Sequence, residues 1–235
     1  MNKITAHHSR DNHAAFTMLE LVFVIIVIGI LAAMSVSRVE RDLRQEAADN
    51  ILSDIRYTQH LALTDNKQRL DQPTWERAYW HIVFGTCQDT DRYYMIGSDR
   101  DLGGSNNAYF DENESAIDPV NGKPMFWRNG QDCSDINETY SDRIFITKKY
   151  GIVSIDSSGG CGSARHIAFD HIGRPYHGVG FSNADAPRHA GYMSEDCIFT
   201  FTMSTDQDND GAQDNFKIQI NSETGYAFIK DQNRS

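Results

Sequence analysis

Glu20 is the first residue whose chemistry needs an explanation, because it lies within a nearly unbroken apolar run, residues 14–34. A carboxylate in hydrocarbon costs roughly 3 kcal/mol on insertion scales, and more when it is isolated. Such a group snorkels to the headgroups, takes up a proton, or pairs with a positive group from a neighbouring chain. Its role depends on what the apolar run is.

A second set of carboxylates has the spacing of a calcium-binding loop. The segment DQDNDGAQD, residues 206–214, resembles the opening of an EF-hand loop, with alternate acidic side chains and a glycine at the turn. Lys217 stands where that loop carries a bidentate glutamate, so the full motif is absent. The segment predicts either a partial calcium site or a solvated acidic hairpin. The candidate ligands are Asp206, Asp208, Asp210 and Asp214.

The four cysteines, Cys87, Cys133, Cys161 and Cys197, lie far apart and form no CxxC pair. A compact zinc site is therefore not expected. An even number of cysteines after an apolar segment favours two disulfides and an oxidising compartment such as the periplasm. All three pairings stay open, and four buried free thiols are the alternative.

Two asparagines lie in segments of the form Asp-x-Asn-x-Ser/Thr: Asn113 in DENES, residues 111–115, and Asn137 in DINET, residues 135–139. This is the extended acceptor pattern of bacterial N-glycosylation. A chance occurrence in a stretch rich in Asp and Asn is the alternative.

No motif of an enzyme is apparent. The histidines form no HExxH pattern, and no GxSxG or phosphate-binding glycine loop occurs. One catalytic alternative makes Cys161 a nucleophile with His166 or His171 as its base, but ordinary core or surface histidines are favoured. We therefore expect a protein that is not an enzyme. No motif requires a cofactor, and calcium is the one candidate.

The composition bounds the class of partner. The chain has 235 residues and a net charge of −11, and no stretch after residue 40 is strongly basic. Binding of nucleic acid is not expected, since neutralising phosphates requires clustered Lys and Arg. The length suits one ordinary domain with an appendage.

Periodicity predicts a long N-terminal helix, from about residue 16 to about residue 64. Its first part is apolar on all sides and long enough to span hydrocarbon over about 16–35. In its second part apolar residues recur every three or four positions, among them Val39, Leu43, Ile51 and Ile55. This second part is therefore amphipathic.

The remainder, residues 66–235, predicts a β-rich domain with a long polar loop near 99–142. The expected fold class is α+β, with the helix packed by its distal half on an antiparallel sheet. The expected strands are residues 78–86, 92–98, 143–149, 151–156, 166–170, 197–204, 216–221 and 226–231.

The start of the chain resembles the class III prepilin signature of type IV pilins and type II secretion pseudopilins. A polar leader, residues 1–15, precedes AFTMLELVFVIIVIGILA, in which Phe16, Thr17 and Glu20 occupy the positions of the signature. The resemblance implies cleavage between Ala15 and Phe16 by a prepilin peptidase and N-methylation of the new Phe16 amine. Ala15 stands where the family usually has Gly, and it too is small.

The C-terminal half resembles minor pseudopilins of the GspH/FimT type. The matching segments are ARHIAFDHIGRPY (164–176), CIFTFTMS (197–204) and IQINSETGYAFI (218–229). We expect Gly173 and Gly225 to occupy turn positions with positive φ, and Pro175 to set up the strand that follows. The fold implied by this resemblance is pilin-like.

The resemblance gives Glu20 a role. After cleavage the Phe16 amine is positive, and Glu20 lies one helical turn away on the same side. Two such helices, shifted axially by about one turn, would place the Glu20 of one subunit near the Phe16 amine of its neighbour. Misregistered packing would leave the carboxylate unpaired in lipid. Glu20 would thus set the register of assembly.

The sequence therefore predicts a minor pilin or pseudopilin, a structural subunit of a type II secretion pseudopilus or type IV pilus. Its implied partners are other pilins, the prepilin peptidase and the inner-membrane assembly platform. We expect a single-pass protein of the bacterial inner membrane with its C-terminal domain in the periplasm. The alternative is a membrane-tethered periplasmic domain that binds calcium or acts as an adhesin and does not polymerise.

Overall fold

The computed structural model of the chain describes residues 17–67, 71, 75–100, 110–128, 130–177, 191–206 and 211–231, and only the backbone of residues 33–42, 76 and 77. The predicted leader, residues 1–15, lies outside these ranges. The chain separates into two compact units, Met1–Glu40 and Arg41–Ser235. The first contains the start of the helix α1 (Met18–Thr64), and the second contains the rest of α1 and the described strands.

The helix α1 begins where its first turn is capped. The backbone N–H of Glu20 donates to Oγ1 of Thr17 at 3.3 Å, so Thr17 satisfies one of the N–H groups that the helix leaves unpaired. No proline interrupts the helix, and Gly29 is its single glycine. The predicted helix is therefore confirmed from Met18 to Thr64.

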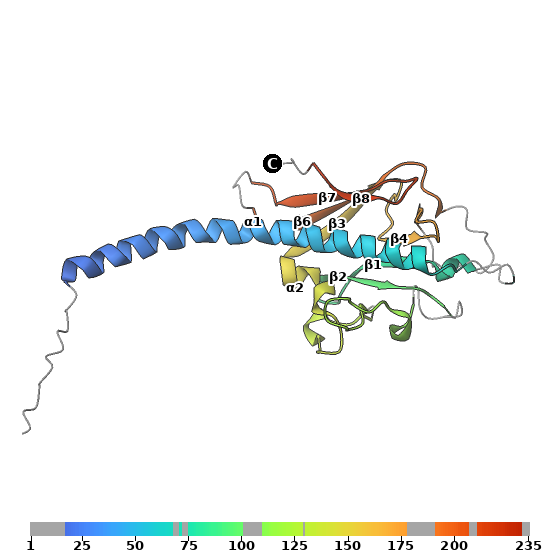
Figure 1. Ribbon diagram of the computed structural model, residues 1–235, viewed down its shortest axis with the longest axis horizontal. Helices are drawn as coiled ribbons and strands as arrows, with labels where there is room; N and C mark the ends of the chain where they lie inside the picture. Colours follow the sequence, from blue (N-terminus) through green and yellow to red (C-terminus); the bar gives the residue numbers. More distant parts are fainter. Residues whose placement is uncertain are drawn as a thin grey trace, which may run out of the picture. The chain divides into compact units, whose positions relative to one another are not determined.

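The second unit contains two antiparallel sheets of four strands each, where the sequence predicted a single sheet (Figure 1). In the first sheet the order is β2-β1-β4-β5, and in the second it is β3-β6-β7-β8. The strands of the first sheet are β1 (Trp80–Thr86), β2 (Arg92–Gly97), β4 (His166–Phe169) and β5 (Pro175–Tyr176). The strands of the second sheet are β3 (Ile152–Gly159), β6 (Cys197–Met203), β7 (Asn215–Ile220) and β8 (Ala227–Lys230).

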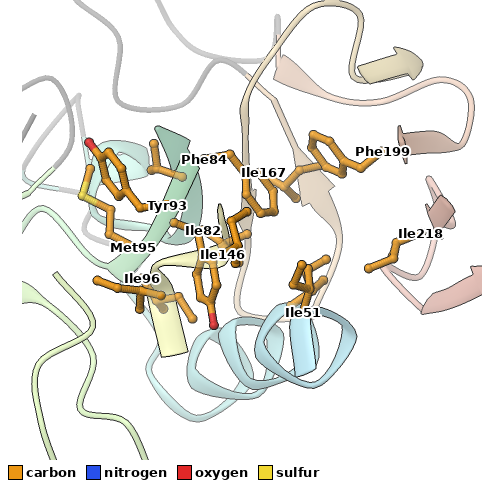
Figure 2. Close-up of a cluster of buried hydrophobic side chains, with 14 of the residues drawn as sticks. Ile51, Ile82, Phe84, Tyr93, Met95, Ile96, Ile146, Ile167, Phe199 and Ile218 are labelled. Atoms are coloured by element: carbon orange, nitrogen blue, oxygen red, sulfur yellow. The ribbon is translucent and has the colours of Figure 1, made fainter. Parts of the chain in front are cut away.

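Both sheets and the second half of α1 share one hydrophobic core (Figure 2). Side chains along β6 alternate between buried and half-buried, which is the period-two pattern of a strand with one face on the core. From α1, Ile51 and Ile55 are fully buried in the same cluster. The expected α+β class, with an N-terminal helix and antiparallel sheets, is confirmed.

One expected strand is wrong. Residues 143–149 form a 3₁₀ turn, η4 (Asp142–Ile144), followed by the short helix α2 (Ile146–Tyr150). Three consecutive apolar residues, 144–146, are all buried, which a strand with one exposed face does not allow. Gly151, at φ 73°, then ends α2 in the left-handed conformation that glycine favours.

The polar stretch near 99–142 contains more structure than a solvated loop. Its described part includes the 3₁₀ turns η2 (Glu112–Glu114) and η3 (Cys133–Asp135), and a further turn, η1 (Trp75–Ala78), precedes β1. The stretch also covers the outer edge of β2, because the N–H of Ile96 donates to the Met125 carbonyl at 3.0 Å. Met125 and Trp127 are buried in the core. The stretch is polar in composition, and several of its apolar residues are buried, although Ile117 and Val120 are exposed.

Two disulfides are present, Cys87–Cys133 and Cys161–Cys197. The first joins the end of β1 to η3, and the second joins the turn after β3 to the start of β6. The expectation of two disulfides is therefore confirmed, and the structure selects one of the three pairings that the sequence left open. All four cysteines are buried in the shared core, so each disulfide joins two distant segments of the chain inside that core.

The two turns singled out by their glycines meet at α1. Gly173 has φ 85° and Gly225 has φ 68°, so both positive-φ predictions are confirmed. A Cβ on Gly225 would lie 2.1 Å from the Gly173 carbonyl oxygen, which leaves no room for a side chain. Gln59 of α1 donates through Nε2 to the carbonyls of Gly173 and Thr224, each at 2.9 Å. One helix side chain thus joins a turn of each sheet.

Candidate functional site

The start of α1 combines a capped helix terminus with an exposed carboxylate. Thr17 caps the first turn, and Glu20 is the third residue of the helix, where the partial positive charge of the helix terminus favours an acid. Among the described residues, no hydrogen bond or ion pair to the Glu20 carboxylate is found. The carboxylate is exposed and open to a partner from outside these residues.

The side chains that follow Glu20 form an apolar surface around the helix. Met18 is 88% exposed and Phe23 is 68% exposed, and the large apolar residues from Leu19 to Leu31 are all exposed as well. Water does not stabilise such a helix, since one that is apolar all round is normally buried in lipid or among other helices. A shallow groove along it, lined by Leu19, Glu20, Phe23 and Val27, places the carboxylate among apolar side chains.

Within the ranges that the structure describes, no helix is both long enough and apolar enough to cross a membrane. The predicted span over about 16–35 extends past these ranges, because residue 16 and the side chains of 33–42 lie outside them. Ala15 and Phe16, the residues of the predicted cleavage site, also lie outside the described residues.

The predicted calcium loop is described only at its ends, since Asp208 and Asp210 lie outside the described residues. Asp206 accepts a hydrogen bond from the backbone N–H of Gly211 at 3.1 Å. Asp214 accepts one from Oγ1 of Thr205 at 3.2 Å. These bonds are those of a turn between β6 and β7, and calcium binding stays a prediction.

One group of possible metal ligands occurs among the described residues, and its chemistry argues against a metal. Cys87, Asp89 and Cys133 have ligand atoms within 4.8 Å of one another. The two sulfurs are joined in a disulfide, so neither is the thiolate that a metal would bind. The same argument applies to Cys161, which is bonded to Cys197 and is therefore not the free nucleophile of the catalytic alternative.

His166, one of the two candidate bases, is better explained as a core residue, as is His81 of β1, whereas His171, the other candidate, is half-buried in the turn after β4. Burial lowers the pKa of His166 to about 3, and burial lowers the pKa of His81 to about 4. Both rings are therefore neutral near pH 7. His81 Nδ1 lies 2.7 Å from the Tyr79 carbonyl, which fixes the orientation of the ring on β1.

Both candidate glycosylation sites are on the surface. Asn113 is exposed on η2, and Asn137 is exposed after η3, where its Oδ1 accepts from the N–H of Thr139 at 2.9 Å. The two segments lie side by side, because the Tyr140 hydroxyl donates to Glu112 at 2.9 Å. Both asparagines are accessible, and their modification stays a prediction.

A buried charged cluster was missed by the sequence analysis. Arg143 donates to Asp54 of α1 at 2.9 Å and to Asp118 at 3.0 Å, and all three side chains are buried. Tyr94 of β2 donates to the second oxygen of Asp54. One guanidinium faces two carboxylates, and burial, the largest cause, raises the pKa of Asp54 to about 6.

This cluster fixes the position of the polar stretch against α1. The available signal in the sequence is the position of Asp54, which comes three residues after Ile51 and four before Thr58 and thus lies on the buried face. A charge on the core face of a helix needs a partner. Nothing in the sequence identifies Arg143, 89 residues away, as that partner.

Comparison with known proteins bears on the N-terminal segment. The family model described as the prokaryotic N-terminal methylation motif matches residues 10–36. No curated protein and no solved structure matches the chain. The match supports the class III prepilin signature that the residues around Phe16 and Glu20 resemble.

Proposed function

We propose that the chain is a minor pilin or pseudopilin, a structural subunit of a type II secretion pseudopilus or a type IV pilus. The prepilin peptidase cleaves between Ala15 and Phe16 and the new amine is methylated. The subunit is held in the bacterial inner membrane by the apolar part of α1, over about 16–35, with its globular unit in the periplasm. It then enters the fibre through an assembly platform in that membrane.

The observation that carries this proposal is that the methylation motif coincides with a helix segment whose apolar side chains are exposed. The methylation motif matches residues 10–36, and the described apolar side chains of that same stretch are exposed around the helix. An exposed apolar helix needs either lipid or neighbouring helices to cover it. A pilin subunit meets both environments, first in the membrane and then in the core of the fibre.

Glu20 supplies the register of assembly. Its carboxylate has no partner among the described residues and lies in an apolar groove, so a positive group from a neighbouring subunit would offset its desolvation. The methylated Phe16 amine of that neighbour has the required charge. A wrong axial shift would leave the carboxylate unpaired in an apolar environment.

Two features of the globular unit support the finer assignment to minor pseudopilins of the GspH/FimT type. Gly173 and Gly225 have the positive φ that the resemblance leads one to expect at their turns, and Gln59 of α1 donates to the Gly173 and Thr224 carbonyls of those two turns. The two disulfides suit an oxidising compartment such as the periplasm.

Co-expression with a prepilin peptidase tests the proposal. The mass of the full chain, measured from membranes, should fall by that of residues 1–15, and the new N-terminus should be a methylated Phe16. A chain that keeps Met1 in the presence of an active peptidase, which cleaves a known prepilin in the same cells, would contradict the proposal.

The variant Glu20→Ala separates processing from assembly. It should be cleaved and inserted as the wild type is, but its incorporation into filaments should fall by at least tenfold, as measured in sheared filament fractions. Glu46→Ala is the matched control, because Glu46 is an exposed carboxylate on the same helix within the globular unit. Wild-type incorporation of Glu20→Ala would remove the register role.

A further inference from the structure

A basic hollow lies where α1 enters the globular unit. It has a volume of about 200 Å³, and its cations come from three elements: Arg44 from α1, Lys217 from β7 and Lys230 from β8. Asp231 is the one acid among its lining residues. Three cations and one carboxylate give the hollow a net charge of +2, on a chain whose net charge is −11.

The cations of this basic hollow are held together at an electrostatic cost. Lys217 and Lys230 are directly opposite each other in the register of β7 and β8. Like charges at such paired positions repel and destabilise a sheet. The ion pairs found among the described residues include neither lysine, nor Arg44. An anion bound from outside would remove the repulsion.

The position of the hollow along the chain indicates which anion. Arg44 comes ten residues after Met34, the last residue of the apolar run, and Arg38 and Arg41 lie between them in the sequence. Basic side chains close to a bilayer attract anionic lipid phosphates in the leaflet that they face, which in the proposed topology is the periplasmic leaflet. Arg44 and Gln45, which line the hollow, are among the first α1 residues of the globular unit.

We propose that the basic hollow binds the phosphate of an anionic phospholipid headgroup and so holds the globular unit against the membrane surface before assembly. This inference rests on the proposed function, because it requires that the preceding apolar segment be in the membrane. A neighbouring subunit of the fibre is the alternative occupant, and the filament-incorporation outcome below tests it. A zwitterionic headgroup also carries a phosphate, but its own ammonium group offsets that charge, so it would relieve the lysine repulsion less than an anionic headgroup does.

Native mass spectrometry of the full chain in neutral detergent micelles tests this proposal. Phosphatidylglycerol or phosphatidylcholine is added at matched mole fractions, and the retained lipid is counted. The wild type should retain phosphatidylglycerol in preference to phosphatidylcholine. In Lys217→Gln/Lys230→Gln the apparent affinity for phosphatidylglycerol should fall about 25-fold at low salt, because each lysine near a lipid surface contributes about fivefold.

The matched control is Lys123→Gln/Arg128→Gln, which removes the same charge from the segment around η2, outside the hollow. It should retain phosphatidylglycerol within twofold of the wild type. An equal loss in this control would show a net-charge effect and overturn the proposal. Thermal unfolding of both double variants at or above the wild-type temperature shows that lost binding is not lost folding, and removal of the lysine repulsion should raise that temperature in Lys217→Gln/Lys230→Gln.

Two further competition experiments, on the same micelles, distinguish a lipid phosphate from a free phosphate. Inorganic phosphate and glycerol phosphate should each compete only weakly with the lipid. If free phosphate binds and phosphatidylglycerol is not retained, the hollow is a small-anion site and the lipid proposal is wrong. If neither binds and the lysine variant fails only in filament incorporation, the hollow is a subunit contact. Peptidase cleavage, scored on the same samples, reports separately on the proposed function.

Discussion

The two parts of α1 hold their apolar side chains in opposite environments. In the first unit Phe23 is 68% exposed, and its large apolar neighbours are exposed too. In the second unit Ile51 and Ile55 are fully buried against two sheets. Both stretches belong to the same helix, but most of the stability of a helix comes from what its apolar face packs against. The second part of α1 packs against the core of the globular unit, whereas the first part has no such contact among the described residues.

This difference separates a self-sufficient region from a dependent one. The globular unit supplies its own core, two disulfides, a buried charged cluster and the Gln59 link between turns. The first part of α1 has its cap at Thr17 and its backbone bonds, and it needs lipid or other subunits to cover its surface. A fibre subunit of the kind proposed, which is stored in the membrane and then moves into the fibre, would benefit from this separation.

The largest expected effect compares two phenylalanines. Phe199→Ala, in the core between the sheets, should lower the free energy of unfolding of the globular unit by about 3–5 kcal/mol, through lost burial and the cavity that remains. Phe23→Ala should change it by less than about 0.5 kcal/mol. Urea unfolding of the full chain in neutral micelles measures both. Equal losses in the free energy of unfolding for the two variants would contradict the separation between a self-sufficient globular unit and a dependent first part of α1.

The disulfides should come next. Cys87→Ala/Cys133→Ala and Cys161→Ala/Cys197→Ala should each lower the free energy of unfolding by about 2–4 kcal/mol. Their sequence separations are 46 and 36 residues, so the loop-entropy contributions differ by only about 0.2 kcal/mol. Urea unfolding of each double variant, with the oxidised wild type as reference, checks this. A variant as stable as the wild type would show that its bond constrains little.

Acid should destabilise the globular unit, and Asp54 should moderate that effect. Burial holds the pKa of His81 at about 4 and of His166 at about 3, so both lose their contribution to stability as the pH falls below 6.5. Burial raises the pKa of Asp54 to about 6, so its contribution is largest below pH 4 and is lost as the pH rises through 6. The loss of stability from the two histidines at acidic pH is larger than the gain from protonation of Asp54, because their pKa values are shifted further in sum.

Asp54→Asn should therefore lose stability more steeply than the wild type between pH 6 and pH 4, by on the order of 2 kcal/mol. Thermal unfolding at half-unit pH steps measures the slope, and Asp49→Asn, an exposed acid on the same helix, is the control. Parallel pH profiles for Asp54→Asn and the wild type would show that Asp54 titrates normally.

The smallest expected effect concerns the turn link. Gln59→Ala removes two hydrogen bonds to the carbonyls of Gly173 and Thr224 and should cost about 1–2 kcal/mol. Gln45→Ala, on an exposed face of the same helix, should cost less than about 0.5 kcal/mol. Hydrogen exchange at the two turns gives a second readout. Faster exchange at one turn alone would mean that the turns are not held together by Gln59.

Local patterns in the sequence predicted much of this molecule. The 3.6-residue period identified α1, and alternation identified most strands to within two residues, because both patterns arise from neighbours along the chain. The positive φ of Gly173 and Gly225 followed from their turn motifs. The error at 143–149 arose because Ile and Thr favour strands, whereas the packing of three adjacent buried residues and the cap at Gly151 selected a helical turn.

The sequence alone determined the apolar helix with its single early carboxylate, the methylation motif and the α+β class, since each is encoded by residues close together in the chain, and the even number of cysteines could be counted directly. Only the tertiary structure decided the division into two sheets, the pairing of the cysteines, the Arg143 partner of Asp54 and the meeting of Lys217 and Lys230 with Arg44. These depend on contacts between residues far apart in the chain, which packing of the core brings together and no local pattern records.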